Sequence, residues 1–525
     1  MDMQPAIASP EDILQSAIDS AAYEFVDLQI VKPEEEVLQL APGEFALRNQ
    51  VLPLAMDGDT LVVAMGSSDG LTAVDDLGIL LHIPVRAVLA DPSLIRERIE
   101  EYFLERILAN LSGDEGAAEI DDTTDLADLQ KMAGETAVVQ TVNLIFAQAV
   151  RDGASDIHIE PYERDLKVRY RVDGMLTDVM HPPKRMHAAV VSRLKILGEM
   201  NIAERRLPQD GRIRITIAGR SIDVRVSIVP TVYGERAVMR ILDKTTAVIG
   251  LTELGMQQDT FEKFKRLIHI PHGIVLVTGP TGSGKSTSLY AALQEIWSPT
   301  TNILTIEDPV EYQVAGIGQI QVRPNIGLTF ANGLRSIVRQ DPDVIMVGEI
   351  RDHETAEIAI HAALTGHLVF STLHTNDAPG AITRLLDMGV EPYLVASSLV
   401  GVVAQRLVRR VCATCGEPSF PSAETLRAVG ITQADSAANP TVRAGKGCEK
   451  CQGTGFKGRQ GLFEMLTVDE PIRRMTVERR SSNEMRTHAI EHQGMRTLIG
   501  DGRLAVLAGR TTPEEVLRVC QREVV

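Results

Sequence analysis

Apolar residues follow two kinds of spacing along the chain, and each kind predicts a different type of sheet. In 166–172 apolar and polar residues alternate, and "RIRITIAGRSIDVRVSIV" (212–229) continues the alternation through two more strands. This pattern is typical of an antiparallel sheet with one exposed face. Four other runs are apolar throughout and are separated by helical stretches: 274–277, 303–306, 344–347 and 368–370. These runs predict a parallel, doubly wound α/β sheet whose strands are buried on both faces.

Together with the turns and caps between them, these patterns divide the chain into parts. In the first part, a strand, an Asp-Gly turn and a second strand are expected within 51–66, with helix starts at Ser9-Pro10 and Pro92. Residues 107–130 contain seven acidic residues and no basic one, which is typical of a solvated linker. The predicted parts are an N-terminal α/β module at 1–105, an acidic linker at 106–135, an α+β domain at 136–245, a doubly wound α/β core at 246–405, a tetracysteine subdomain at 406–460 and a helical subdomain at 461–525.

Charge and composition restrict the classes of function. The formal net charge is −18 and aromatic residues make up 4% of the chain, so neither phosphate neutralisation nor base stacking is favoured. A nucleic-acid partner is therefore not expected. The N-terminus lacks the basic and apolar regions of a secretory signal, and the uncharged segment 392–405 is too short to span a bilayer. We expect a cytoplasmic protein that reaches a membrane only through partners.

The strongest motif is "GPTGSGKS", which follows the apolar strand "GIVLV" and opens a helix. Strand, loop and helix in this order are the context that a nucleotide-binding P-loop requires. Its backbone N–H groups would cradle phosphates, Lys285 would reach the β- and γ-phosphates, and the Ser286 hydroxyl would bind Mg²⁺. The predicted ATP-binding residues are Gly279, Pro280, Thr281, Gly282, Ser283, Gly284, Lys285, Ser286 and Thr287.

Acidic and histidine residues follow the neighbouring apolar strands. Glu307 and Asp308 end one strand, and Glu349 follows Gly348 at the end of the next. Ligands of open α/β sheets bind beyond the carboxyl ends of strands, where such acids orient water or hold Mg²⁺. His367 and His374 flank a further strand and could sense a γ-phosphate. A zinc site between these two histidines is improbable, because they lie at opposite ends of the strand and point to opposite faces.

Four of the five cysteines form two close pairs, Cys412-x₂-Cys415 and Cys448-x₂-Cys451. Four thiolates predict a structural Zn²⁺ site without an open position for catalysis. A disulfide pair is the alternative, although a reducing cytoplasm disfavours it. On the polar face of the alternating strands, Arg212, Arg214 and Arg225 form either a solvated basic surface or a phosphate-binding one.

Several long segments resemble the secretion ATPases, the hexameric motors of type II secretion and type IV pilus machines. The segments are the P-loop, "IEDPVEY" (306–312), "RQDPDVIMVGEIRD" (339–352), "TGHLVFSTLHTNDA" (365–378), "NIAERRLPQDGRI" (201–213) and "GMRTLIGDGRLAVLAGRTTPEEVLRV" (494–519). The resemblance implies a RecA-like P-loop NTPase core preceded by a PAS-like α+β domain. The segment "NIAERRLPQDGRI" resembles a type II secretion (GspE-like) ATPase more than a type IV pilus assembly (PilB-like) one.

The resemblance also implies roles for individual residues. Glu349 would help to hold hydrated Mg²⁺ and Glu307 would polarise the lytic water, with the exchange of these two roles as the alternative. His374, with His367 nearby, would report on the γ-phosphate. Arg225, Arg240 and Arg212 would reach the nucleotide from the second domain, since a guanidinium binds phosphate oxygens in a bidentate manner. The implied partners are five further copies in a homo-hexamer and GspL-like and GspF-like platform proteins of the inner membrane. A DNA-translocating ring and a nucleotide-dependent switch are the alternative functions.

Overall fold

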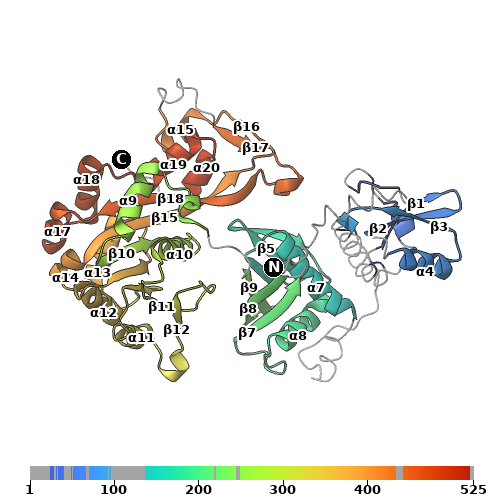
Figure 1. The fold of residues 1–525 in the computed structure, drawn as a ribbon, viewed down its shortest axis with the longest axis horizontal. Helices are drawn as coiled ribbons and strands as arrows, with labels where there is room; N and C mark the ends of the chain where they lie inside the picture. Colours follow the sequence, from blue (N-terminus) through green and yellow to red (C-terminus); the bar gives the residue numbers. More distant parts are fainter. Residues whose placement is uncertain are drawn as a thin grey trace, which may run out of the picture.

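The computed structural model describes residues 136–217, 220–243, 249–432 and 442–520, together with parts of 24–98 that include 51–66 and 70–92. Figure 1 shows three folded units along the chain, coloured blue, teal to green, and bright green through yellow to red. The helix start expected at Ser9-Pro10, most of the helix expected after Pro92 and the acidic linker at 106–135 lie outside the described residues. No helix within the described ranges combines the length and the apolar content that crossing a bilayer requires.

The first unit is a three-stranded sheet with the order β1-β2-β3. Strands β1 (Val51–Asp57) and β2 (Thr60–Met65) form the expected hairpin, with Gly58 in the left-handed region at the Asp-Gly turn. Helix α4 (Leu71–Leu81) then connects β2 to the parallel strand β3 (Val85–Leu89). A short helix, α2 (Glu35–Leu38), precedes the sheet. The α/β character predicted for this part of the chain is confirmed.

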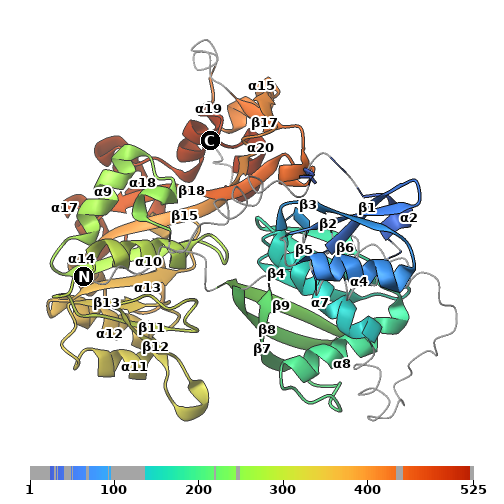
Figure 2. The same cartoon turned by 45° about the vertical axis from the view of Figure 1, so that its right-hand side comes forward.

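The second unit, which we call the arginine unit, is an antiparallel sheet with the order β6-β5-β4-β9-β8-β7. Helices α7 (Thr136–Arg151) and α8 (His187–Leu197) lie beside this sheet (Figure 2), and the apolar positions of β5 supply part of their shared core. Tyr170 is fully buried there, and its hydroxyl donates to the carbonyl of Ile145 at 2.7 Å. The strands are β4 (Asp156–Pro161), β5 (Leu166–Val172), β6 (Met175–Met180), β7 (Gln209–Ile217), β8 (Arg220–Thr231) and β9 (Gly234–Asp243).

The third unit contains a seven-stranded sheet with the order β12-β11-β13-β14-β10-β15-β18, parallel except for the antiparallel pair β15–β18. Four of its strands confirm the predicted apolar runs: β10 (Gly273–Thr278), β11 (Ile303–Glu307), β13 (Val344–Val347) and β14 (Leu368–Leu373). The other three strands are β12 (Gly318–Gln321), β15 (Leu399–Val411) and β18 (Phe456–Thr467). The helices around the sheet are α9 (Gln258–Ile268), α10 (Lys285–Ile296), α11 (Phe330–Ile337), α12 (His353–Leu364), α13 (Pro379–Asp387) and α14 (Pro392–Ser398).

Strands β15 and β18 join the sheet to the rest of the chain. The expected boundaries at 405/406 and 460/461 fall inside these two strands. Between them lie the cysteine pairs, with β16 (Gly416–Pro418), β17 (Arg443–Gly445) and α15 (Ala423–Ala428). The expected helical end consists of α17 (Glu470–Val477), α18 (Ser482–Gln493), α19 (Leu498–Leu507) and α20 (Pro513–Val519). Residues of these helices share one apolar core with β10 and β15, so the sheet and the helical end pack as one body.

Candidate nucleotide site

The P-loop occupies the turn between β10 and α10, as the motif predicts. Gly279, Gly282 and Gly284 have φ values of 149°, 78° and 86°, which side-chain-bearing residues rarely adopt. A Cβ at Gly279 would lie 2.5 Å from the carbonyl oxygen of Gln405, so the loop also needs glycine to pack against β15. The N–H groups at the start of α10 therefore face the space where phosphates would bind.

Lys285 holds the loop in shape in this structure. Its ammonium donates to the carbonyls of Gly279 and Pro280 at 2.9 and 3.0 Å. Burial lowers the pKa of Lys285, although the nearby Glu349 carboxylate opposes that change. The Ser283 hydroxyl is buried and has no hydrogen-bond partner among the described residues, while Ser286 is exposed. In this structure the loop thus exposes the Ser286 hydroxyl, while its own carbonyls hold the Lys285 ammonium.

At the carboxyl ends of β10, β13 and β14, Glu349 lies near two other residues that were predicted for the site, Lys285 and His374. One of its oxygens lies 3.4 Å from His374 Nε2, and the other pairs with Arg351. The preceding Gly348 explains why no aspartate ends this strand. A Cβ there would lie 3.3 Å from the backbone of Glu307, which is closer than most side chains tolerate. The acid is therefore displaced by one residue, to a position facing Lys285.

Glu307 has different surroundings from those expected of a residue that polarises water. It is 4% exposed, and its carboxylate accepts hydrogen bonds from Thr305 at 2.6 Å, from Gln319 at 3.2 Å and from the Tyr290 hydroxyl. Burial raises the pKa of Glu307, and these three donors oppose that change. The carboxylate thus faces α10 and β12 rather than solvent.

Glu311 is a candidate that the sequence analysis missed. It lies in the same acidic segment, its side chain is 36% exposed, and a carboxylate oxygen lies 3.9 Å from Arg225 NH1. Arg225 also donates to the carbonyl of Val310 at 3.0 Å. Glu311 could have been predicted from the sequence, because in "EDPVEY" (307–312) it lies beyond the end of the strand that Glu307 ends. The structure therefore places an arginine of the second unit against the acidic segment of the third.

The predicted arginines form a single row across the sheet of the arginine unit. Arg212 on β7 is directly opposite Arg225 on β8, which is directly opposite Arg240 on β9. Arg240 pairs in turn with Asp156 on β4, at 3.0 Å. Burial lowers the pKa of Arg225, and Arg212 and Arg240 act in the same direction while Glu311 opposes them. Such a row is an electrostatically unfavourable arrangement that a bound anion would relieve.

His367 does not belong to this group, which corrects the expectation that it acts beside His374. Its Nδ1 lies 2.7 Å from the carbonyl of Ala362, and its own carbonyl accepts from Gly273 N–H at the start of β10. The P-loop follows the other end of that strand. The six residues of β14 separate His367 from His374 by roughly 20 Å at the usual rise per residue.

The four paired cysteines converge, as their spacing predicts. Their sulfur atoms all lie within 4.8 Å of one another. The distances Cys412–Cys448, Cys415–Cys451 and Cys448–Cys451 are 3.9, 3.7 and 3.7 Å. Four sulfurs at about 2.3 Å from a tetrahedral Zn²⁺ would be about 3.8 Å apart, so these residues are positioned to bind a metal. The fifth cysteine, Cys520, is buried at the end of α20.

Comparison with known protein families accounts for most of the chain. Residues 131–518 match the family described as type II/IV secretion system protein, and residues 21–107 match the MshEN domain. The chain belongs to the type II/IV secretion system protein family. It is accordingly an ATPase with a RecA-like core, and the resemblance inferred from its motifs is confirmed.

Individual members of the secretion ATPase family carry two kinds of name. HxcR, a type II secretion system protein of Pseudomonas aeruginosa, is 49% identical over 81% of this chain and 89% of its own length. The type IV pilus assembly ATPase PilB of Myxococcus xanthus is 44% identical over 94% of this chain and 88% of its own. Among solved structures, the pilus retraction motor PilT with bound ADP is 26% identical over 72% of this chain and 96% of its own, with a TM-score of 0.50.

Proposed function

We propose that this secretion ATPase hydrolyses ATP to drive pseudopilus assembly and protein export in a type II secretion system. The observation that carries the proposal is the convergence of Lys285, Glu349 and His374 at one edge of the sheet, with Arg225 held against the adjoining acidic segment. More of the similar proteins are named for type II secretion than for pili. Assembly of a type IV pilus is the second candidate, because PilB is nearly as similar.

Replacing Lys285 by Ala in the source organism tests the choice between these two systems. Loss of ATP turnover should stop export of the secreted proteins while surface pili remain. Loss of pili with normal export would instead favour the pilus role. If neither changes although the purified variant lacks ATPase activity, the motor serves another machine.

The residues of the site suit ATP with Mg²⁺. The P-loop N–H groups, Lys285 and Arg225 would bind phosphate oxygens, and Ser286 and Glu349 would hold the hydrated metal, whose charge offsets that of the phosphates. Two carboxylates are candidates for orienting the attacking water. Glu311 is already partly exposed beside Arg225, whereas Glu307 would first have to leave its three donors. We assign this step to Glu311 and retain Glu307 as the second candidate. His374, through its contact with Glu349, would sense the γ-phosphate.

The cysteine cluster is assigned to a structural Zn²⁺ ion, since four sulfur ligands leave no position open for catalysis. Metal analysis of the purified protein tests this assignment, with one equivalent of zinc expected. A variant with serine at Cys412 and Cys448 should lose the metal.

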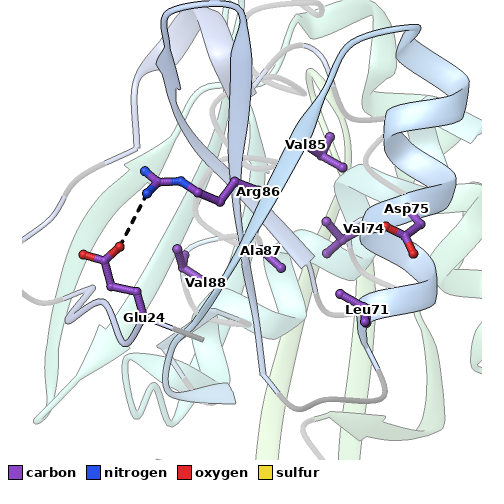
Figure 3. Close-up of a pocket in the computed structure, with 8 residues that line it drawn as sticks. All are labelled: Glu24, Leu71, Val74, Asp75, Val85, Arg86, Ala87 and Val88. Atoms are coloured by element: carbon purple, nitrogen blue, oxygen red, sulfur yellow. Dashed lines mark ion pairs between the residues drawn. The ribbon is translucent and has the colours of Figure 1, made fainter. Parts of the chain in front are cut away.

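A closed ring of six copies would convert the opening and closing of the arginine unit on the nucleotide into mechanical movement. We propose that the ring works in the cytoplasm and docks on GspL-like and GspF-like platform proteins of the inner membrane. The exposed side chains of Ile79 and Leu80 on α4 support a docking role for the first unit. A pocket of about 410 Å³ lies between the same helix and β3, where Arg86 pairs with Glu24 (Figure 3). DNA translocation is less favoured because of the acidic charge.

A further inference from the structure

A turn of the arginine unit contacts the strand that follows the cysteine cluster. Asp173 lies in the turn between β5 and β6 and has a left-handed φ of 49°. Its carboxylate accepts a hydrogen bond from the Gly458 N–H at 2.7 Å and lies 3.7 Å from Arg459 Nε. Gly458 and Arg459 belong to β18, which is part of the ATPase sheet. The Asp173 carboxylate thus joins the two units at a second contact, which is far from Arg225 in the sequence.

A third contact lies directly beside the cysteines. Gln452, the residue after Cys451, donates from its side-chain amide to Asp152 Oδ1 at 2.7 Å. Asp152 immediately follows α7, and only 9% of its side chain is exposed. Gln452 itself has a left-handed φ of 51°. Two aspartates of the arginine unit therefore meet residues 448–459, which we call the metal arm.

The shape of the metal arm depends on the cysteine sulfurs. Cys451 Sγ accepts hydrogen bonds from the Cys448 and Gly455 N–H groups at 3.1 and 3.3 Å. The carbonyl of Gly455 in turn accepts from Cys412 N–H at 3.0 Å. The backbone around Gly445 and Gly455 is so close that a Cβ on either would overlap the other. Ligation of the sulfurs would therefore fix the positions of Gln452 and Gly458.

The contact is linked to the arginine row through β5. Arg171, two residues before Asp173, is directly opposite Asp156, and their side chains lie 3.6 Å apart. Asp156 holds Arg240, the neighbour of Arg225 in the row. The arginine unit is therefore attached to the third unit at three places: Asp173 and Asp152 on the metal arm and Arg225 on the acidic segment. A rigid body attached at three places has a defined angle to the surface that it covers.

We infer that Asp173 and Asp152 are positioning residues that hold the arginine row over the nucleotide site by binding the metal arm. This inference rests on the proposed function of the row. It gives the cysteine cluster a role in the ATPase reaction without direct contact with ATP. Because the sulfurs set the shape of the arm, metal binding would favour the closed position of the arginine unit.

Hydrogen exchange of the full-length protein tests the contact directly. In Asp173→Gly the acceptor is lost, while glycine tolerates the left-handed turn, so strain does not confuse the result. We expect exchange of the amides at 457–459 to become about tenfold faster or more. Asp173→Asn keeps an acceptor oxygen and should remain close to the wild type. Asp165→Gly, in the turn between β4 and β5 at the opposite end of β5, is the matched control and should leave these amides unchanged.

Steady-state kinetics test the positioning role. Asp173→Gly should raise the KM for ATP roughly three- to tenfold while kcat stays within about twofold, because the row contributes to binding. In the Arg225→Ala background the same change should have no further effect, since both act through one contact. Treatment of the wild type with a zinc chelator should reproduce the faster exchange at 457–459.

Three results would overturn the inference. The first is unchanged exchange at 457–459 in Asp173→Gly, and the second is an effect on KM that persists in the Arg225→Ala background. The exchange experiment needs no ATP turnover, so it distinguishes failure of the contact from failure of the proposed function. If exchange responds but the ATP kinetics do not, the arm binds the arginine unit without positioning it, and the inference is likewise wrong.

Discussion

Glu307 and Glu349 follow adjacent parallel strands, yet their environments give them different capabilities. The Glu349 carboxylate lies beside Lys285, His374 and Arg351, with 13% of its side chain exposed. The Glu307 carboxylate is enclosed by Tyr290, Thr305 and Gln319. An acid that already uses both oxygens for internal donors has little capacity left for a water molecule. Sequence position alone treats the two residues as equivalent, and the surrounding side chains distinguish them.

Glu349→Gln should therefore abolish most ATP turnover without loss of folding. The change removes the negative charge that faces Lys285 but preserves side-chain size, so we expect kcat to fall about 100-fold or more. Binding of ATP should persist, because the P-loop and Lys285 are intact. A phosphate-release assay, combined with binding of a fluorescent ATP analogue, measures both quantities. A variant that keeps more than half of the wild-type kcat would contradict the role of Glu349.

Glu307→Gln should mainly reduce stability. An amide offers one acceptor where the carboxylate offers two, and its NH₂ group would face one of the existing donors. Leaving a buried donor unsatisfied costs about 1–3 kcal/mol. We expect the urea midpoint of the third unit to fall accordingly. Trp297, the only tryptophan in the chain, donates to the Gly316 carbonyl at 3.1 Å and reports on this unit by fluorescence. Unchanged stability together with lost activity would instead support Glu307 as the residue that polarises water.

At the scale of elements, apolar pattern predicted what is buried but not which strands pair. Strands β10, β11, β13 and β14 are apolar throughout because helices cover both faces of the sheet, so they were recognisable. Strand β18 has charged residues near its start and pairs with β15 across the cysteine insertion. No local spacing encodes a pairing over that distance. His367 illustrates the same limit, because proximity to a strand does not say which end of the strand faces the ligand.

Helix α20 shows how tertiary contacts change a local motif. Thr512 caps the helix, and its hydroxyl accepts from Glu515 N–H. The Glu515 side chain, however, binds Arg409 on β15 at 2.6 Å rather than completing a capping box with the Thr512 N–H. Burial opposes ionisation of Glu515, but Arg518 and Arg409 outweigh it and lower its pKa to about 2. The residue therefore joins the last helix to the ATPase sheet, an outcome that only the packed structure reveals.

Glu464 on β18 connects three elements and should make stability depend on pH. It is 3% exposed and accepts from the Ala378 N–H before α13 and the Leu498 N–H of α19. Burial raises its pKa from 4.5 to about 7. Between these values the unfolded chain has lost the proton while the folded protein keeps it. The contribution of Glu464 to stability is therefore present below about pH 4.5 and is lost as the pH rises to 7.

Glu464→Gln removes this titration, so the variant should gain stability relative to the wild type as the pH rises. The change in the difference should be about 3 kcal/mol between pH 4.5 and pH 8. Urea unfolding followed by Trp297 fluorescence at several pH values measures it. Glu424→Gln, at an exposed position on α15, is the control and should show no such trend. A constant difference across this pH range would mean that the carboxyl titrates normally.

For the whole molecule, the decisive question is which copy supplies the arginines to a given nucleotide site. Arg225 contacts Val310 and Glu311 of its own chain, and Asp173 contacts Gly458 of the same chain. The arginine unit thus lies against the acidic segment of its own chain, so the proposed reach of its arginines to the nucleotide would be within one polypeptide. A ring built from such chains would contain six sites that are each complete within a copy, with neighbours transmitting movement rather than catalytic groups.

Mixing two variants that are both defective at an ATP concentration well below the wild-type KM tests this arrangement. Lys285→Ala lacks the phosphate lysine, and Arg225→Ala lacks the arginine. If arginines act within their own chain, every site in a mixed ring has one defect, so we expect no recovery of ATPase activity at any ratio. If they act across the interface, roughly a quarter of the sites in an equal mixture would be intact and activity would return. Rings unfolded and reassembled together ensure mixing, and differently tagged copies purified in tandem confirm it. Recovered activity in doubly tagged rings would show that the neighbouring copy supplies the arginine.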